Sequence, residues 1–178
     1  MRALCAVLLL TTGSLAGAQP QKDRETYTLP VKVTLGDGRT VQGKVEFQAP
    51  REMLLQHTRD QITYEKLLRI ADIGSIEFLQ WNGRKVKDSR DGSVFEFRPA
   101  ELVLTLKSGQ ELQRSGELPF LNEFVLSNEN GRVKFFTYWL DLRKADGTWY
   151  TAIEGPQLKR KVCHKDIIKK IDFSTDHP

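Results

Sequence analysis

The chain has 178 residues, with 27 Lys and Arg, 23 Asp and Glu, and a formal net charge of +4. Both signs of charge are interspersed, and the pI of about 9.1 is only mildly basic, which is typical of a solvated surface rather than of a nucleic-acid-binding protein. Because of this mild and mixed charge, we expect no nucleic-acid partner. The length suits one domain or two very small ones.

The first 18 residues have the three parts of a secretory signal peptide. Arg2 provides a positive charge, residues 3–10 are apolar, and Ala16-Gly17-Ala18 matches the small-residue pattern that precedes a cleavage site. The apolar stretch is too short to span a bilayer, and no later segment is long or apolar enough. We expect cleavage after residue 18, a flexible leader over residues 19–26, and an exported protein that does not span the membrane.

The cysteines bear on the compartment. Cys5 would leave with the signal peptide, so Cys163 would stand alone and no intramolecular disulfide could form. Small secreted animal domains usually carry disulfides. Their absence favours a bacterial periplasm, with the cell surface or the medium as alternatives.

Alternation of apolar and polar residues predicts an all-β fold. Residues 31–35 and 41–47 alternate on either side of a turn at residues 36–39, where glycines permit the positive φ of a tight turn. We expect further strands at residues 53–55, 62–64, 75–80 and 94–97, and one helical or 3₁₀ turn at residues 65–70.

The Asn82-Gly83 pair is a strong signal for a hairpin turn. Residues 82–98, which are rich in charge, are therefore expected to form a hairpin tip or linker between two halves of the chain.

The second half repeats the first. Three strand residues and a glycine turn recur 71 positions later: Val31, Val33, Leu35 and Asp37-Gly38 match Leu102, Leu104, Leu106 and Ser108-Gly109. The offset is 73 at Gly116, Leu118 and Phe120, which predicts a bulge at residues 113–115. It returns to 71 where Ile62 and Tyr64 match Val133 and Phe135.

Both halves end in one motif, Ile73-x-x-Ile76-Glu77-Phe78 and Ile168-x-x-Ile171-Asp172-Phe173. This agreement in order predicts two tandem β repeats, residues 27–81 and 99–174. The second carries an insertion at residues 136–161, expected to be a hairpin with a turn at residues 145–148.

The repeated unit, V-x-L-x-D-G-x-x-x-x-G-x-V-x-F followed by an apolar strand and I-x-x-I-E-F, resembles small five-stranded barrels of the Sm-like or SH3-like kind. It also looks like the tandem small-barrel repeats of uncharacterised exported bacterial proteins. The resemblance implies two barrel-like repeats of antiparallel strands and a binding or assembly role. It transfers no RNA site, because no base-binding Asn or Arg-Gly pair lies at a matching place.

Residues able to do chemistry are few. His57 or His164 could serve Cys163 as a base, but Cys163 lies in a basic stretch typical of a solvated strand or loop. No zinc-ligand spacing is present. Glu77 and Asp172 occupy matching places, but they alternate with apolar residues and are expected to face solvent. We expect no catalytic residue, no metal and no cofactor.

The insertion carries the more informative side chains. Tyr138 shares its phase with Leu140 and Leu142 and is expected in the core, whereas Trp139 is expected on the polar face, where a ring suggests a recognition surface. Burial of both faces between the repeats is the alternative. The candidate binding residues are Trp139, Trp149, Tyr150, Arg143, Lys144, Lys159, Arg160 and Lys161.

These observations predict a non-enzymatic, exported protein-binding or assembly module. Its partner would be a protein, an envelope component or an acidic polysaccharide, and oligomers could form through strand edges. The alternatives are a carbohydrate-binding module and an exported hydrolase that uses Cys163 with His57 or His164.

Overall fold

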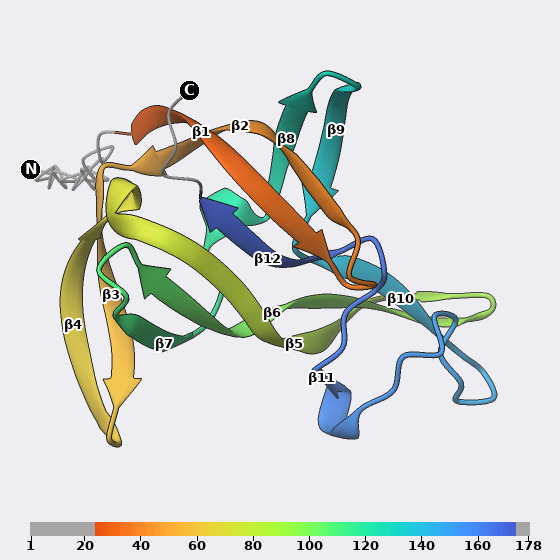
Figure 1. Cartoon of the computed structure of the whole chain (residues 1–178). Coiled ribbons are helices and arrows are strands. Elements are labelled where there is room, and N and C mark those ends of the chain that lie inside the picture. Colours follow the sequence, from red (N-terminus) through yellow and green to blue (C-terminus); the bar gives the residue numbers. More distant parts are fainter. Residues whose placement is uncertain (1–23, 174–178) are drawn as a thin grey trace, which may run out of the picture.

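The computed structural model describes residues 24–173 (Figure 1). The predicted signal peptide and the first part of the expected leader lie outside the described residues, as does His177. The strands are β1 (Arg24–Leu35), β2 (Thr40–Pro50), β3 (Glu52–Arg59), β4 (Ile62–Arg69), β5 (Ile73–Ser89), β6 (Gly92–Leu106), β7 (Glu111–Ser115), β8 (Glu123–Asn128), β9 (Gly131–Phe136), β10 (Trp139–Lys144), β11 (Lys159–Arg160) and β12 (Ile168–Phe173). Three 3₁₀ turns are interspersed: η1 (Ile70–Asp72), η2 (Pro119–Leu121) and η3 (Pro156–Leu158).

The all-β prediction is confirmed: the strands form one antiparallel sheet of 12 strands, with no α-helix in the described part of the chain. The main path runs β4-β3-β7-β6-β5-β12-β1-β2-β8-β9, with β10 on β6 and β11 on β5. The path is open at β4 and β9, so the sheet is not closed into a barrel. Nowhere between residues 24 and 173 does a helix have the length and apolar character needed to cross a membrane.

The predicted first hairpin is confirmed. Val31, Val33 and Leu35 on β1 are buried, as are Val45 and Phe47 on β2, while the residues between them face outward. The hairpin turn is closed by an amide of residue 35 that donates to the carbonyl of residue 39, and the glycine at 38 has φ of +89°. The β6–β7 hairpin has the same turn 71 positions later, from residue 106 to residue 110, with φ of +84° at residue 109.

The two predicted repeats exchange strands. β5 pairs with β6 rather than with β1, and β12 returns from the end of the chain to pair with β1. Likewise β2 pairs with β8, and β3 pairs with β7. Each half of the sheet therefore contains strands from both repeats, and the buried residues form a single hydrophobic core.

Equivalent pairings in the two halves have the same register. Val33 lies opposite Ile171, and Leu104 lies opposite Ile76. Both ladders also shift register at the same place, next to Leu35 in one and Leu106 in the other. Pairings that repeat in this way support a relation between the two segments that goes beyond shared composition.

Several local expectations are wrong. Residues 24–26, expected in the leader, pair with residues 48–50 of β2. No bulge interrupts residues 113–115, because the β6–β7 register is continuous; β7 simply ends at residue 115. The expected turn at residues 65–70 is displaced, since β4 continues to residue 69 and the 3₁₀ turn follows it.

The match of Ile62 and Tyr64 with the second repeat is also wrong. Both side chains are exposed, and the buried residue of β4 is Leu68, which lies opposite Met53. The corresponding pair in the other half is residues 124 and 135, so the offset in this strand is 67. The β3–β4 hairpin is longer than the β8–β9 hairpin, which the apolar pattern alone did not indicate.

Asn82-Gly83 is not a turn. Both residues lie within β5, and the chain reverses at residues 90–91 instead. Gly83 lies opposite Phe97, and a Cβ at this glycine would be 2.6 Å from the Phe97 ring. The glycine therefore makes room for a buried aromatic side chain on the neighbouring strand.

A basic arm as the candidate functional site

The distal half of the β5–β6 hairpin and the insertion form an arm, defined here as residues 82–98 and 136–161. In Figure 1 it extends to the right of the molecule, away from the β3–β4 hairpin on the opposite side. β10 pairs with residues 92–97 of β6, and β11 pairs with residues 81–82 of β5. The insertion is therefore hydrogen-bonded to both strands of the long hairpin.

The interior of the arm is aromatic. The Trp139 ring is stacked on Phe97, with ring centroids 4.9 Å apart, and it meets Trp81 edge-on at 5.9 Å. Trp149 meets Phe95 and Phe97 edge-on at 5.2 and 5.4 Å. Such contacts contribute about 0.5–1.5 kcal/mol per pair beyond the burial of area, so the cluster fixes the insertion to the hairpin.

The expected phase of the insertion strand is inverted. Trp139 is 6% exposed and Thr137 and Asp141 are buried, whereas Leu140 is 58% exposed. Asp141 tolerates burial because its carboxylate accepts hydrogen bonds from the amide and the hydroxyl of Thr151, at 3.2 and 2.5 Å. Trp139 is thus part of the scaffold and is not an exposed recognition residue.

Arg160 closes the interior. Only 1% of it is exposed, and its guanidinium carbon lies 4.8 Å from the ring centroids of both Phe97 and Trp149. Nε donates to the carbonyl of Ile153 at 3.1 Å, and Nη1 donates to that of Gly155 at 2.9 Å. Burial lowers the pKa of this guanidinium, although the charges of nearby carboxylates oppose the shift. Arg160 therefore holds the loop in place from inside.

The opposite face of the β5–β6 hairpin carries an ion network. Arg84 Nη2 and Arg98 Nη2 donate to the Glu96 carboxylate at 2.8 and 3.0 Å, and Arg98 Nη1 donates to Glu117 at 2.9 Å. These guanidinium groups, Arg98 first, hold the pKa of Glu96 below its usual range, and Glu96 in turn raises the pKa of Arg98. The Arg98 guanidinium also lies 4.9 Å above the Tyr138 ring.

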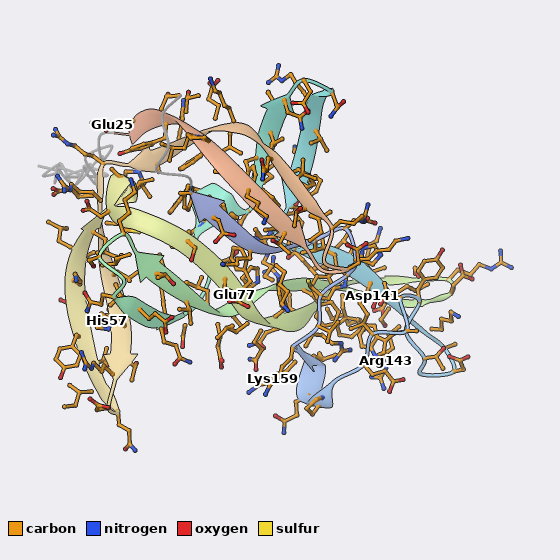
Figure 2. The ribbon with its side chains drawn as sticks, in the orientation of Figure 1. Glu25, His57, Glu77, Asp141, Arg143 and Lys159 are labelled. Atoms are coloured by element: carbon orange, nitrogen blue, oxygen red, sulfur yellow. The ribbon has the colours of Figure 1, made fainter. Side chains whose placement is uncertain are left out.

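The remaining predicted binding residues are exposed on the arm. Tyr150 is 75% exposed, and Arg143, Lys144, Lys159 and Lys161 also face solvent; Figure 2 marks Arg143 and Lys159. Within residues 24–173, none of these four cations lies within ion-pair distance of a carboxylate. Leu140 and Val162 add exposed apolar surface. Neither apolar residue was among the predicted binding residues, and Leu140 was expected in the core.

The residues considered for catalysis are not brought together productively. Cys163 is buried, and burial raises the pKa of its thiol to about 11, so the group stays protonated at neutral pH. His57 lies on β3, stacked on Tyr64, in the part of the sheet opposite the arm (Figure 2). His164 lies next to Cys163 in sequence, and its Nδ1 is 3.7 Å from the Asp166 carboxylate. The described residues include no group of three or more acidic, His or Cys side chains placed to hold a metal ion.

Comparisons with models of protein families, with curated proteins and with solved structures give no match for this chain.

Proposed function

We propose that this protein is a non-enzymatic, exported binding or assembly module whose arm holds an acidic partner, either a protein or an acidic polysaccharide. The observation that supports this most is the charge of the arm. Residues 82–98 and 136–161 contain ten Lys and Arg against six Asp and Glu, a net charge of +4 that equals the net charge of the whole chain. The rest of the chain is neutral on balance, so the field that attracts an acidic partner originates at the arm.

The packed aromatic interior of the arm also supports a binding role. Arg143 and Lys144 are presented by a paired strand, and Lys159 by β11, so these cations are held on a scaffold rather than on a free loop. A preorganised surface loses less conformational entropy on binding than a mobile one. Tyr150, an exposed aromatic residue among these cations, is of a type enriched at binding interfaces.

The fold resemblance supports an assembly role as well. Each half of the main path has five strands, as the small Sm-like or SH3-like barrels do, although the predicted repeats exchange strands and the sheet stays open. We infer that the two repeats are variants of one such unit. The carbohydrate-binding alternative has less support, because Trp81 and Trp139 are buried and cannot stack on a sugar ring. The hydrolase alternative has less support because the Cys163 thiol is buried.

A matched pair of charge-reversal variants tests the proposal. Arg143→Glu/Lys144→Glu/Lys161→Glu changes the arm, and Lys32→Glu/Lys44→Glu/Lys107→Glu makes the same change of charge at exposed positions elsewhere. The probes are poly-L-glutamate and polygalacturonate, titrated by calorimetry near physiological salt. We expect the arm variant to bind at least one probe about tenfold or more weakly, and the control less than about twofold more weakly. Equal losses in both variants, or no binding by the unmodified protein, would contradict the proposal.

A further inference from the structure

The two halves of the sheet differ where β3 meets β7. β2 and β8 pair over three residues, Lys44, Val45 and Glu46 on β2, whereas β3 and β7 pair only at Thr58 and Gln113. Beyond that pair, residues 52–57 of β3 have no strand partner on the β7 side within the described chain. The edge of β3 that faces β7 is thus unpaired along residues 52–57, whereas its other edge is paired with β4 over the whole strand.

The cause lies in the chain after β7. β2 is continuous to residue 50, but β7 ends at residue 115, Gly116 takes φ of +90°, and the chain turns into η2. The change of repeat offset from 71 to 73 falls at this place. The second repeat therefore turns away from β3. It leaves a gap beside β3 at the place where, in the other half, β2 pairs with β8.

This gap is a groove of about 440 Å³. Its lining is mostly apolar and consists of Gln48, Pro50, Met53, Leu54, Arg114, Leu118, Pro119 and Phe120. Leu54 is 57% exposed, although it lies at the centre of β3 directly opposite Leu67, another exposed residue. The groove thus has apolar walls and an unpaired strand edge along one side.

Arg114 lies in this groove at a position where an apolar residue is expected. On β7 it shares the core-facing phase of the buried Leu112, and it lies opposite the buried Leu102. Its Nε donates to the carbonyl of Ser115 at 3.3 Å, and no carboxylate of the described residues lies within ion-pair distance of it. Burial alone lowers the pKa of this guanidinium. Leu102 pairs with Arg114 as Val31 pairs with Gly43, so the strand register, unlike the sequence offset of 73, matches Arg114 to Gly43, where a Cβ would be 2.5 Å from Leu126.

A half-buried arginine that lacks an acidic partner and faces an apolar groove is complementary to a carboxylate on an apolar molecule. The unpaired edge of β3 adds a second requirement, a backbone that can continue the sheet. A peptide meets both. Only its C-terminal residue combines an apolar side chain and a carboxylate in one residue, which is the combination that the groove offers to a ligand.

We propose that the groove binds the C-terminal segment of a partner polypeptide as an added strand along β3, with its terminal carboxylate on Arg114 and its apolar side chains against Leu54 and Phe120. This site is separate from the arm, and its test does not depend on the function proposed for the arm.

The test uses the full chain and two mixtures of hexapeptides randomised at the last three positions, one with a free C-terminal carboxylate and one with a C-terminal amide. Bound peptides are identified by mass spectrometry, and the most enriched acid is then titrated beside its amide. We expect enrichment of apolar C-terminal residues in the acid mixture, and binding of the amide about tenfold or more weakly.

Four variants make the result specific. Arg114→Gln should weaken the acid peptide about tenfold without lowering the melting temperature, since the unpaired charge stabilises nothing in the free protein, whereas Arg114→Lys should weaken it less. Arg132→Gln, an exposed arginine on β9, should leave binding unchanged. The arm charge-reversal variant should also bind normally. No enrichment relative to Arg114→Gln would overturn the proposal, as would equal binding of acid and amide. Binding of sodium decanoate without any enriched peptide would likewise overturn it and indicate a fatty-acid site.

Discussion

Ile76 and Ile171 lie directly opposite each other where β5 pairs with β12. They hold the same position in the two predicted repeats, and the pairs on either side, Glu77 with Lys170 and Ser75 with Asp172, are arranged symmetrically about them. Both isoleucines are buried. The exchange of strands is therefore centred on this one pair of side chains, which joins the two halves of the sheet.

Truncation of this pair should destabilise the whole molecule. Ile76→Ala and Ile171→Ala should each lower the free energy of unfolding by about 2–5 kcal/mol, and the double variant should deviate from additivity because the side chains are in contact. Urea denaturation followed by circular dichroism and by tryptophan fluorescence measures this. Because each half contains strands of both repeats, both probes should report one coincident transition. Two separate transitions would mean that the repeats fold independently.

Removal of the Arg160 guanidinium should release the loop of the arm without affecting the core. Arg160→Met retains an apolar stem between Phe97 and Trp149, but leaves the carbonyls of Ile153 and Gly155 without their donor. Hydrogen exchange at residues 145–158 should accelerate by about tenfold or more, while amides of β1 keep their protection. Lys159→Met is the control, since Lys159 is exposed. Unchanged exchange in Arg160→Met would show that the aromatic contacts alone hold the loop.

The ion network should contribute a pH-dependent part of the stability. The pKa of Glu96 is held below its ordinary value of 4.5 by Arg98 and Arg84, so the stabilisation is present above that value and is lost as the pH falls through the lowered pKa. Glu96→Gln should therefore cost about 1–3 kcal/mol at pH 7 and much less near pH 3. Urea titrations of both proteins at several pH values measure the difference. A cost that does not change with pH would contradict the role of the charge, and Glu52→Gln, at an exposed site, should show little cost at any pH.

The Cys163 thiol should be unreactive in the folded protein. Its pKa is raised to about 11 by burial, whereas an ordinary thiol titrates near pH 8.5. In a Cys5→Ser background, reaction with a disulfide reagent at pH 8 should be slower in native protein than in urea by on the order of a hundredfold. Rapid reaction of the native protein would show an accessible thiolate. It would contradict this prediction and favour the hydrolase alternative.

Part of the fold could be predicted from the sequence. Alternation and glycine turns identified the β1–β2 hairpin and its counterpart because both faces of these strands are unambiguous, one apolar and one polar. The strand exchange could not be predicted, since β5 presents the same apolar residues to β6 as it would to β1. The phase of β10 was misjudged because Asp141 is polar but buried, with its carboxylate bonded internally to Thr151.

The candidate site was predicted only in part. Of the predicted binding residues, Tyr150, Arg143, Lys144, Lys159 and Lys161 are exposed, whereas Trp139 and Arg160 belong to the interior of the arm. The groove was missed altogether, although one signal was available. Arg114 follows Leu112 by two residues, so unbroken alternation places it on the core-facing side, but residues 113–115 were expected to form a bulge.

An NMR titration measures most directly whether the arm is the binding surface. Poly-L-glutamate is added to ¹⁵N-labelled protein, and the amide shifts are followed residue by residue. We expect the largest changes within residues 82–98 and 136–161, Arg143, Lys144 and Tyr150 among them, and we expect these changes to diminish as salt is added. Changes of equal size on the β3–β4 hairpin or across the β8–β9 hairpin, with the arm unaffected, would contradict it.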